Sequence, residues 1–128
     1  MKVIFWVIVS ILLAVLMMVA GIQHIWNPDF YLPFVPASLP YPVAIVYGSG
    51  IIELLLGVVT LFLNHKYTKY GLLGIFALMV IFLPLHIIDA LKDQPVIGSP
   101  TLAYIRLVFQ FVLIWLAWGS YKFTSRAK

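Results

Sequence analysis

The stretch VAIVYGSGIIELLLGVVTLFL, residues 43–63, decides the fold of this chain. It carries one charged residue, Glu53, and at about 1.5 Å per helical residue it is long enough to cross the roughly 30 Å hydrocarbon core of a bilayer. Three further apolar stretches of similar length cover residues 3–22, 70–91 and 102–121. We therefore predict an all-α fold, an integral membrane four-transmembrane-helix bundle that forms a single domain over residues 1–128.

Composition excludes a soluble domain and several kinds of chemistry. The chain is 64% hydrophobic and only 9% charged, and its mean hydropathy is +1.11, so too few polar side chains remain to cover a globule. The expected surroundings are the lipid bilayer, and the pI of about 9.5 gives no reason to expect a nucleic-acid partner. Because the chain has no cysteine, it cannot relay disulfides by itself.

The basic residues predict how the bundle lies in the membrane. If the four spans alternate in direction, most Lys and Arg residues outside the spans share one side, and Lys92 alone lies on the other. Cytoplasmic loops carry the excess of positive charge, so we expect both termini in the cytoplasm and the bacterial cytoplasmic membrane as the location. The residues on the basic side are Lys2, Lys66, Lys69, Lys122, Arg126 and Lys128.

The Pro-rich connection between the first two spans should then face outward. Asn27 followed by Pro28 is typical of a helix start, and Pro33 and Pro36 limit how far that helix can run. A solvated linker would not carry so many large apolar side chains. We predict a short helix and an extended piece that lie at the outer interface as a lid over the bundle; the alternative is a passive loop on the membrane surface.

Glu53 is the strongest functional signal in the sequence. An ionisable side chain in hydrocarbon is costly, and it marks a site that contains a partner for it. Gly50, Glu53 and Gly57 are spaced by three and four residues and share one helical face, so tight packing of that face would bury the carboxylate. We favour Arg106 as its partner, either as a purely structural ion pair or as part of a polar pocket that orients a ligand.

Other polar residues are expected at similar depth in the outer half of the membrane. Helical rise places His86 and Arg106 about 8 Å below the outer boundary and Glu53 and Gln110 about 14 to 16 Å below it, with His24 at the boundary itself. His24 and His86 could be axial ligands of a haem, but their depths differ and neither helix offers a second His, so we expect neither haem nor metal. No catalytic residue is predicted. The predicted ligand-binding residues are Glu53, Arg106, Gln110, His24 and His86.

Several motifs form a set that extends along nearly the whole chain. They are Gly21-Ile22-Gln23-His24, then Pro28, Phe30, Pro36 and Leu39-Pro40, then Tyr47-Gly48-Ser49-Gly50-Ile51-Ile52-Glu53-Leu54, then Pro84 and His86, and finally Arg106-Leu107-Val108-Phe109-Gln110. In this combination the chain resembles the DoxX family of small four-helix membrane proteins. It departs from many members at His86, where they carry Asn.

The resemblance implies a membrane bundle whose relatives include small subunits of quinone-linked oxidoreductases and, more distantly, membrane chaperones. Arg, His and Glu side chains supply the donors and the proton-exchanging group that quinone binding needs. We therefore expect an accessory subunit that binds a lipophilic, quinone-like molecule in an outer-leaflet cavity and receives electrons from a redox partner subunit. A non-catalytic chaperone or scaffold for other membrane proteins is the alternative. A further copy of the chain, in a homo-oligomer, is a candidate partner.

Overall fold

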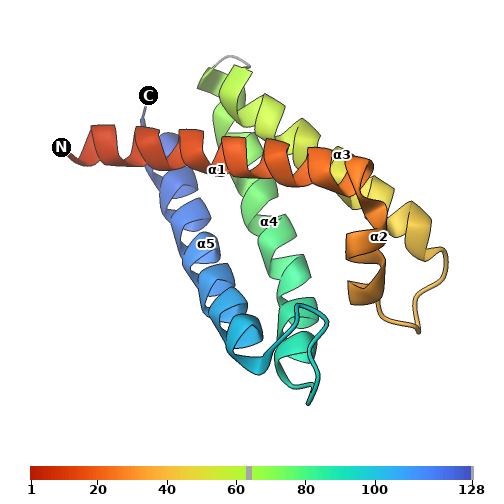
Figure 1. The fold of residues 1–128 in the computed structure, drawn as a ribbon. Coiled ribbons are helices and arrows are strands. Elements are labelled where there is room, and N and C mark those ends of the chain that lie inside the picture. The colour runs from red at the N-terminus through yellow and green to blue at the C-terminus, as the bar shows by residue number, and fades with distance from the viewer. Residues whose placement is uncertain (63–64, 128) are drawn as a thin grey trace.

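The computed structural model describes residues 1–62 and 65–127. The described residues form helices and no strands, in the order α1 (Lys2–Trp26), α2 (Pro28–Tyr31), the 3₁₀ helix η1 (Leu32–Phe34), α3 (Pro42–Phe62), α4 (His65–Ala90) and α5 (Pro100–Arg126) (Figure 1). Of these, α1, α3, α4 and α5 are each long and apolar enough to cross a membrane. The predicted all-helical class with four such helices is confirmed.

Three of the long helices extend beyond the predicted spans. Helix α1 continues to Trp26, because no helix-breaking residue follows Gln23 and His24 until Pro28; His24 therefore lies inside the last turn and not beyond it. Helix α5 begins at Pro100 and is capped by Ser99, whose Oγ accepts a hydrogen bond from the Leu102 N–H at 3.2 Å. Helix α4 already begins at His65. The predicted span end at Leu63, the adjoining Asn64 and the basic residue Lys128 lie outside the described residues.

The long helices form two closely packed pairs, α1 with α3 and α4 with α5. Glycines bring the backbones of α1 and α3 into contact: a Cβ at Gly21 would lie 2.5 Å from the Gly50 carbonyl oxygen, and a Cβ at Gly57 would lie 2.7 Å from that of Ala14. Gly50, Glu53 and Gly57 are all buried, as their spacing predicts. The small-residue face of α3 is therefore packed inward and takes Glu53 with it.

The two pairs meet in the half of the bundle that contains both termini, which we call the closed half. There a Cβ on Gly71 of α4 would collide with Thr60 of α3, and one on Gly119 of α5 would collide with the ring of Trp6 of α1. The adjoining apolar core is built from α1, α4 and α5 and consists of Val9, Leu13, Met17, Leu72, Ile75, Met79, Leu113 and Ala117.

Towards the opposite end α1 and α5 diverge, and the segment formed by α2 and η1 turns back into the space between the helix pairs (Figure 1). We call this end, which carries His24, Glu53, His86 and Arg106, the open half. Helix α2 follows Asn27 with Pro28 in its first turn, as the Asn-Pro pair predicts, although the Asn27 side chain makes no capping hydrogen bond. The segment 28–34 contacts α1 and α3, and we refer to it as the lid.

Candidate ligand-binding site

A cavity of about 320 Å³ lies in the open half, between the four long helices and the lid. All five residues predicted from the sequence as a ligand site line it, so residues separated by up to 86 positions, from His24 to Gln110, are brought together. The remaining lining is mostly apolar. It comprises Leu16, Met17, Ala20, Tyr31, Phe34, Val35, Ile45, Val46, Ser49, Met79, Phe82, Leu85, Phe109 and Leu113.

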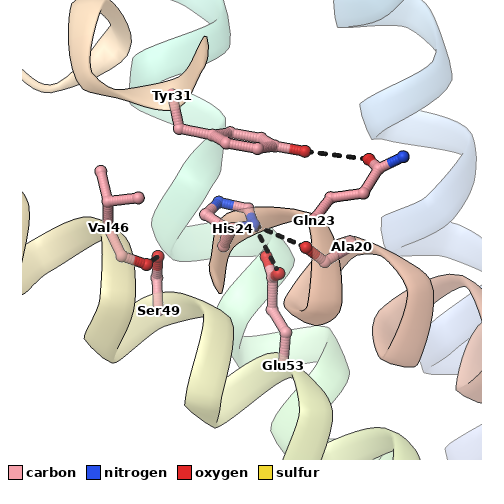
Figure 2. Close-up of polar contacts among 7 residues, drawn as sticks. All are labelled: Ala20, Gln23, His24, Tyr31, Val46, Ser49 and Glu53. Atoms are coloured by element: carbon pink, nitrogen blue, oxygen red, sulfur yellow. Dashed lines mark hydrogen bonds and ion pairs between the residues drawn. The ribbon is translucent and has the colours of Figure 1, made fainter. Parts of the chain in front are cut away.

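Glu53 is paired with α1 and not with α5. Its side chain is 97% buried, and Oε2 lies 3.1 Å from Nδ1 of His24, an ion pair when the imidazole is protonated (Figure 2). The predicted pairing of Glu53 with Arg106 is therefore wrong. The glycine face of α3 packs against α1, so the carboxylate that lies on this face meets the side chain that α1 presents there.

The ring of His24 is held on two sides. Its Nδ1 lies 2.8 Å from the Ala20 carbonyl oxygen one turn earlier in α1, and the ring stacks on Tyr31 of the lid with centroids 3.7 Å apart and planes at 19° (Figure 2). The Tyr31 hydroxyl donates a hydrogen bond to Gln23 Oε1 at 3.0 Å. Burial, reinforced by the charge of Glu53 and opposed by that of Arg106, raises the pKa of Tyr31, which keeps the hydroxyl protonated as a donor. The lid is thus fastened to α1 above the carboxylate.

Arg106 is held by Asp89 and by the lid. Its Nη1 lies 3.6 Å from Asp89 Oδ2, and its guanidinium carbon lies 4.3 Å from the centre of the Phe34 ring. Asp89 is itself buried and accepts hydrogen bonds from the backbone N–H groups of Val96 at 2.7 Å and Ile97 at 3.4 Å. Because α4 and α5 are joined by the short connection 91–99, the end of one helix and the start of the next place Asp89 beside Arg106. Asp89 therefore orients Arg106 and fixes this connection.

Gln110 and His86 complete the polar lining from α5 and α4. Gln110 is buried, and its Nε2 donates a hydrogen bond to the Met79 carbonyl oxygen at 2.7 Å. This bond ties α5 to α4 at the floor of the cavity. His86 is partly buried, and its Nδ1 is enclosed by protein but has no hydrogen-bond partner within residues 1–62 and 65–127.

Unsatisfied polar atoms are concentrated around this cavity. Over the described part of the chain, four buried side-chain polar atoms lack a hydrogen-bond partner, and three of them belong to lining residues: Glu53 Oε2, His86 Nδ1 and Arg106 Nη1. The fourth is Ser120 Oγ, in the closed half. Buried polar groups in folded proteins are nearly always paired, so this concentration makes the cavity the candidate site.

Three contributors to the site were not identified as ligand-binding residues from the sequence. Tyr31 and Phe34 belong to the predicted lid, but their stacking on His24 and Arg106 depends on how the lid folds back. Asp89, near the end of α4, faces Arg106 of α5. Within the described residues, no group of three or more His, Cys, Asp or Glu side chains is arranged to hold a metal ion.

Of the comparisons with known proteins, one gives a match. None of the curated proteins and none of the solved structures matches the chain significantly. A family model described as a domain of unknown function, DUF8561, matches residues 13–120, a stretch that runs from the middle of α1 to the last turns of α5 and includes every lining residue of the cavity. The chain belongs to the DUF8561 family.

Proposed function

We propose that this protein binds a lipophilic, quinone-like molecule in the open-half cavity and serves as an accessory subunit of a membrane oxidoreductase complex. The observation that carries the proposal is the set of three buried atoms around one cavity that lack a hydrogen-bond partner among the described residues: Glu53 Oε2, His86 Nδ1 and Arg106 Nη1. An unsatisfied buried polar group costs about 1–3 kcal/mol, and more if it is charged. A ligand whose oxygen atoms meet these groups recovers that free energy on binding.

The rest of the lining favours a flat, apolar ligand. Phe34, Phe82 and Phe109 line the cavity together with aliphatic side chains, and its volume of about 320 Å³ lies within the range of small-molecule sites, roughly 300–1,000 Å³. Two lining residues, Ile45 and Phe109, are 36% and 53% exposed, and exposed apolar side chains of the spans would face lipid. A ligand dissolved in the bilayer therefore has a short route to the polar groups.

The topology that accompanies this proposal has both termini in the cytoplasm. Basic residues at the helix ends of the closed half support this orientation by the positive-inside rule; they are Lys2, Lys66, Lys69, Lys122 and Arg126. The start of α1 and the last turns of α5 lie at this same end of the bundle (Figure 1). The cavity then lies in the outer half of a bacterial cytoplasmic membrane, with the lid at the outer interface. Tyr41 and Trp26, which are 79% and 87% exposed at this end, are typical interfacial residues.

The accessory role depends on the resemblance to DoxX proteins and on the composition of the chain. We propose that the DUF8561 and DoxX families share this bundle and its polar site. The chain has no cysteine, and its sequence shows no flavin-binding fingerprint, so electrons for quinone chemistry would come from a partner subunit. The cavity would position the ring and exchange protons with it.

Small molecules extracted from the purified protein test this function. The protein is purified in mild detergent as wild type, as Glu53→Gln and as Asp29→Asn, and extracts are compared by mass spectrometry. Asp29 is an exposed carboxylate on the lid and controls for the loss of one acidic group outside the cavity. We expect near-stoichiometric quinone with wild type and Asp29→Asn and a loss of most of it with Glu53→Gln. Bulk phospholipid alone in all three samples would favour the scaffold alternative.

A further inference from the structure

The two sides of the cavity lack different hydrogen-bonding partners: one side lacks a donor and the other lacks an acceptor. Glu53 and His24 lie on the α1–α3 pair, and Arg106 and His86 lie on the α4–α5 pair. The lid contacts both sides, through Tyr31 on His24 and through Phe34 on Arg106. A ring that fills the space beneath the lid therefore meets a carboxylate on one side and a guanidinium on the other.

The carboxylate side needs a donor. His24 Nδ1 has two oxygen neighbours, the Ala20 carbonyl at 2.8 Å and Glu53 Oε2 at 3.1 Å, so this nitrogen carries its hydrogen. The hydrogen bond is made to Ala20, and Glu53 Oε2 accepts none from the described residues. A carboxylate only accepts hydrogen bonds, so the group that satisfies Oε2 must bring an O–H or N–H.

The guanidinium side needs an acceptor. Arginine has five N–H donors and no acceptor, and Asp89 Oδ2, at 3.6 Å from Nη1, is beyond hydrogen-bond distance. The Phe34 ring lies 4.3 Å from the guanidinium carbon, and Nη1 has no hydrogen-bond partner among the described residues. An oxygen with lone pairs, either a carbonyl or a hydroxyl, satisfies Nη1.

We infer that the cavity prefers the reduced, hydroquinone form of its ring ligand to the oxidised quinone form. This inference rests on the proposed function. A hydroquinone donates one O–H to Glu53 and accepts from Arg106 at its other oxygen, so both sides are satisfied. A quinone offers two carbonyl oxygens: the one near Arg106 is bound, and the other faces an acceptor-only carboxylate with no hydrogen between them.

The preference has a measurable size and a redox consequence. The hydroquinone gains a hydrogen bond to the charged Glu53, whereas the quinone places a carbonyl oxygen against the same carboxylate. We therefore expect the hydroquinone to bind at least about tenfold more tightly. Preferential binding of the reduced form raises the midpoint potential of the bound couple, by about 30 mV for each tenfold of preference in a two-electron couple. The protein would therefore hold the ring as a hydroquinone and favour release of the quinone.

Binding of decylubiquinone and decylubiquinol to the detergent-purified protein tests this inference. Both titrations are carried out without oxygen and followed by quenching of tryptophan fluorescence or by calorimetry. We expect a dissociation constant at least about tenfold lower for the quinol. In Glu53→Gln the hydroquinone O–H meets a neutral amide instead of a carboxylate, so this ratio should fall to about one, mainly because the hydroquinone binds less tightly.

Arg106→Gln is the matched variant on the other side. Because both forms of the ring present an oxygen there, it should weaken the two ligands about equally and leave the ratio unchanged. Equal affinities in wild type, or a ratio that survives Glu53→Gln, would overturn the inference while the proposed function stands. If neither form binds, both fail. The wild-type ratio decides the question even if a variant does not fold.

Discussion

The closed half and the open half of the bundle are built from the same four helices but are held together differently. In the closed half, Gly71 and Gly119 let Thr60 and Trp6 of neighbouring helices approach closely. In the open half the helix pairs diverge, and charged residues, a lid and a cavity occupy the space between them. Small residues thus hold the closed half together, and the buried carboxylates Glu53 and Asp89, with Arg106, lie at the end that contains the cavity.

The largest effect is expected from removing the carboxylate that organises the open half. Asp89→Ala leaves Arg106 without its counter-charge and removes the acceptor for the N–H groups of Val96 and Ile97. We predict a loss of about 3 kcal/mol in the free energy of unfolding, measured by denaturant titration in detergent micelles. Asp93→Ala, on the exposed connection, is the control and should change stability little. Equal effects of the two substitutions would show that Asp89 does not organise this end.

A smaller loss is expected from forcing the α1–α3 contact apart. In Gly57→Ala the new Cβ would lie 2.7 Å from the Ala14 carbonyl oxygen, a backbone atom that moves only with its helix, so we predict a loss of about 2 kcal/mol. Gly48 is the matched control on the same helix, because a Cβ there meets nothing within 4 Å. Gly48→Ala should gain about 0.5–1 kcal/mol through helix propensity. The same denaturant titration compares Gly57→Ala with Gly48→Ala. If both substitutions change stability in the same direction, the glycines do not set the close contact of α1 with α3.

A double-mutant cycle measures which partner Glu53 has. With His24→Gln and Glu53→Gln we predict a coupling of about 1 kcal/mol, since the two side chains are 3.1 Å apart and largely buried. The cycle of Glu53→Gln with Arg106→Gln should give a coupling near zero. A larger coupling with Arg106 would restore the pairing favoured from the sequence.

The partner of Glu53 also separates what the sequence alone predicts from what requires the structure. The four apolar stretches and the spacing of Gly50, Glu53 and Gly57 predict the helices and the buried face of α3, because both follow from periodicity within one helix. The same reasoning gathers five lining residues at one end of the bundle from their depths alone. Depth does not say which helix packs against that face, so it could not distinguish His24 from Arg106 as the partner of Glu53. Nor could it place Tyr31 and Phe34, whose positions depend on how the lid folds back.

The smallest effect concerns the lid. Tyr31→Phe keeps the ring that stacks on His24 and removes only an exposed hydrogen bond to Gln23, so stability should fall by no more than about 0.5 kcal/mol. Tyr31→Leu also removes the stacked ring. We expect it to accelerate ligand dissociation several-fold, as followed by stopped-flow fluorescence. Indistinguishable dissociation rates for the two variants would show that the stacked ring does not retain the ligand.

Photo-crosslinking with an azido-quinone tests most directly whether the open half, and not the closed half, holds the ligand. The protein is labelled in detergent or in lipid nanodiscs with and without excess decylubiquinone, and modified residues are mapped by mass spectrometry of peptides. We predict labelling at cavity residues of several helices, such as Met17, Phe82 and Phe109, that the unlabelled quinone suppresses. Labelling that is spread over the outer surface of the bundle, or that excess quinone leaves unchanged, would contradict the account.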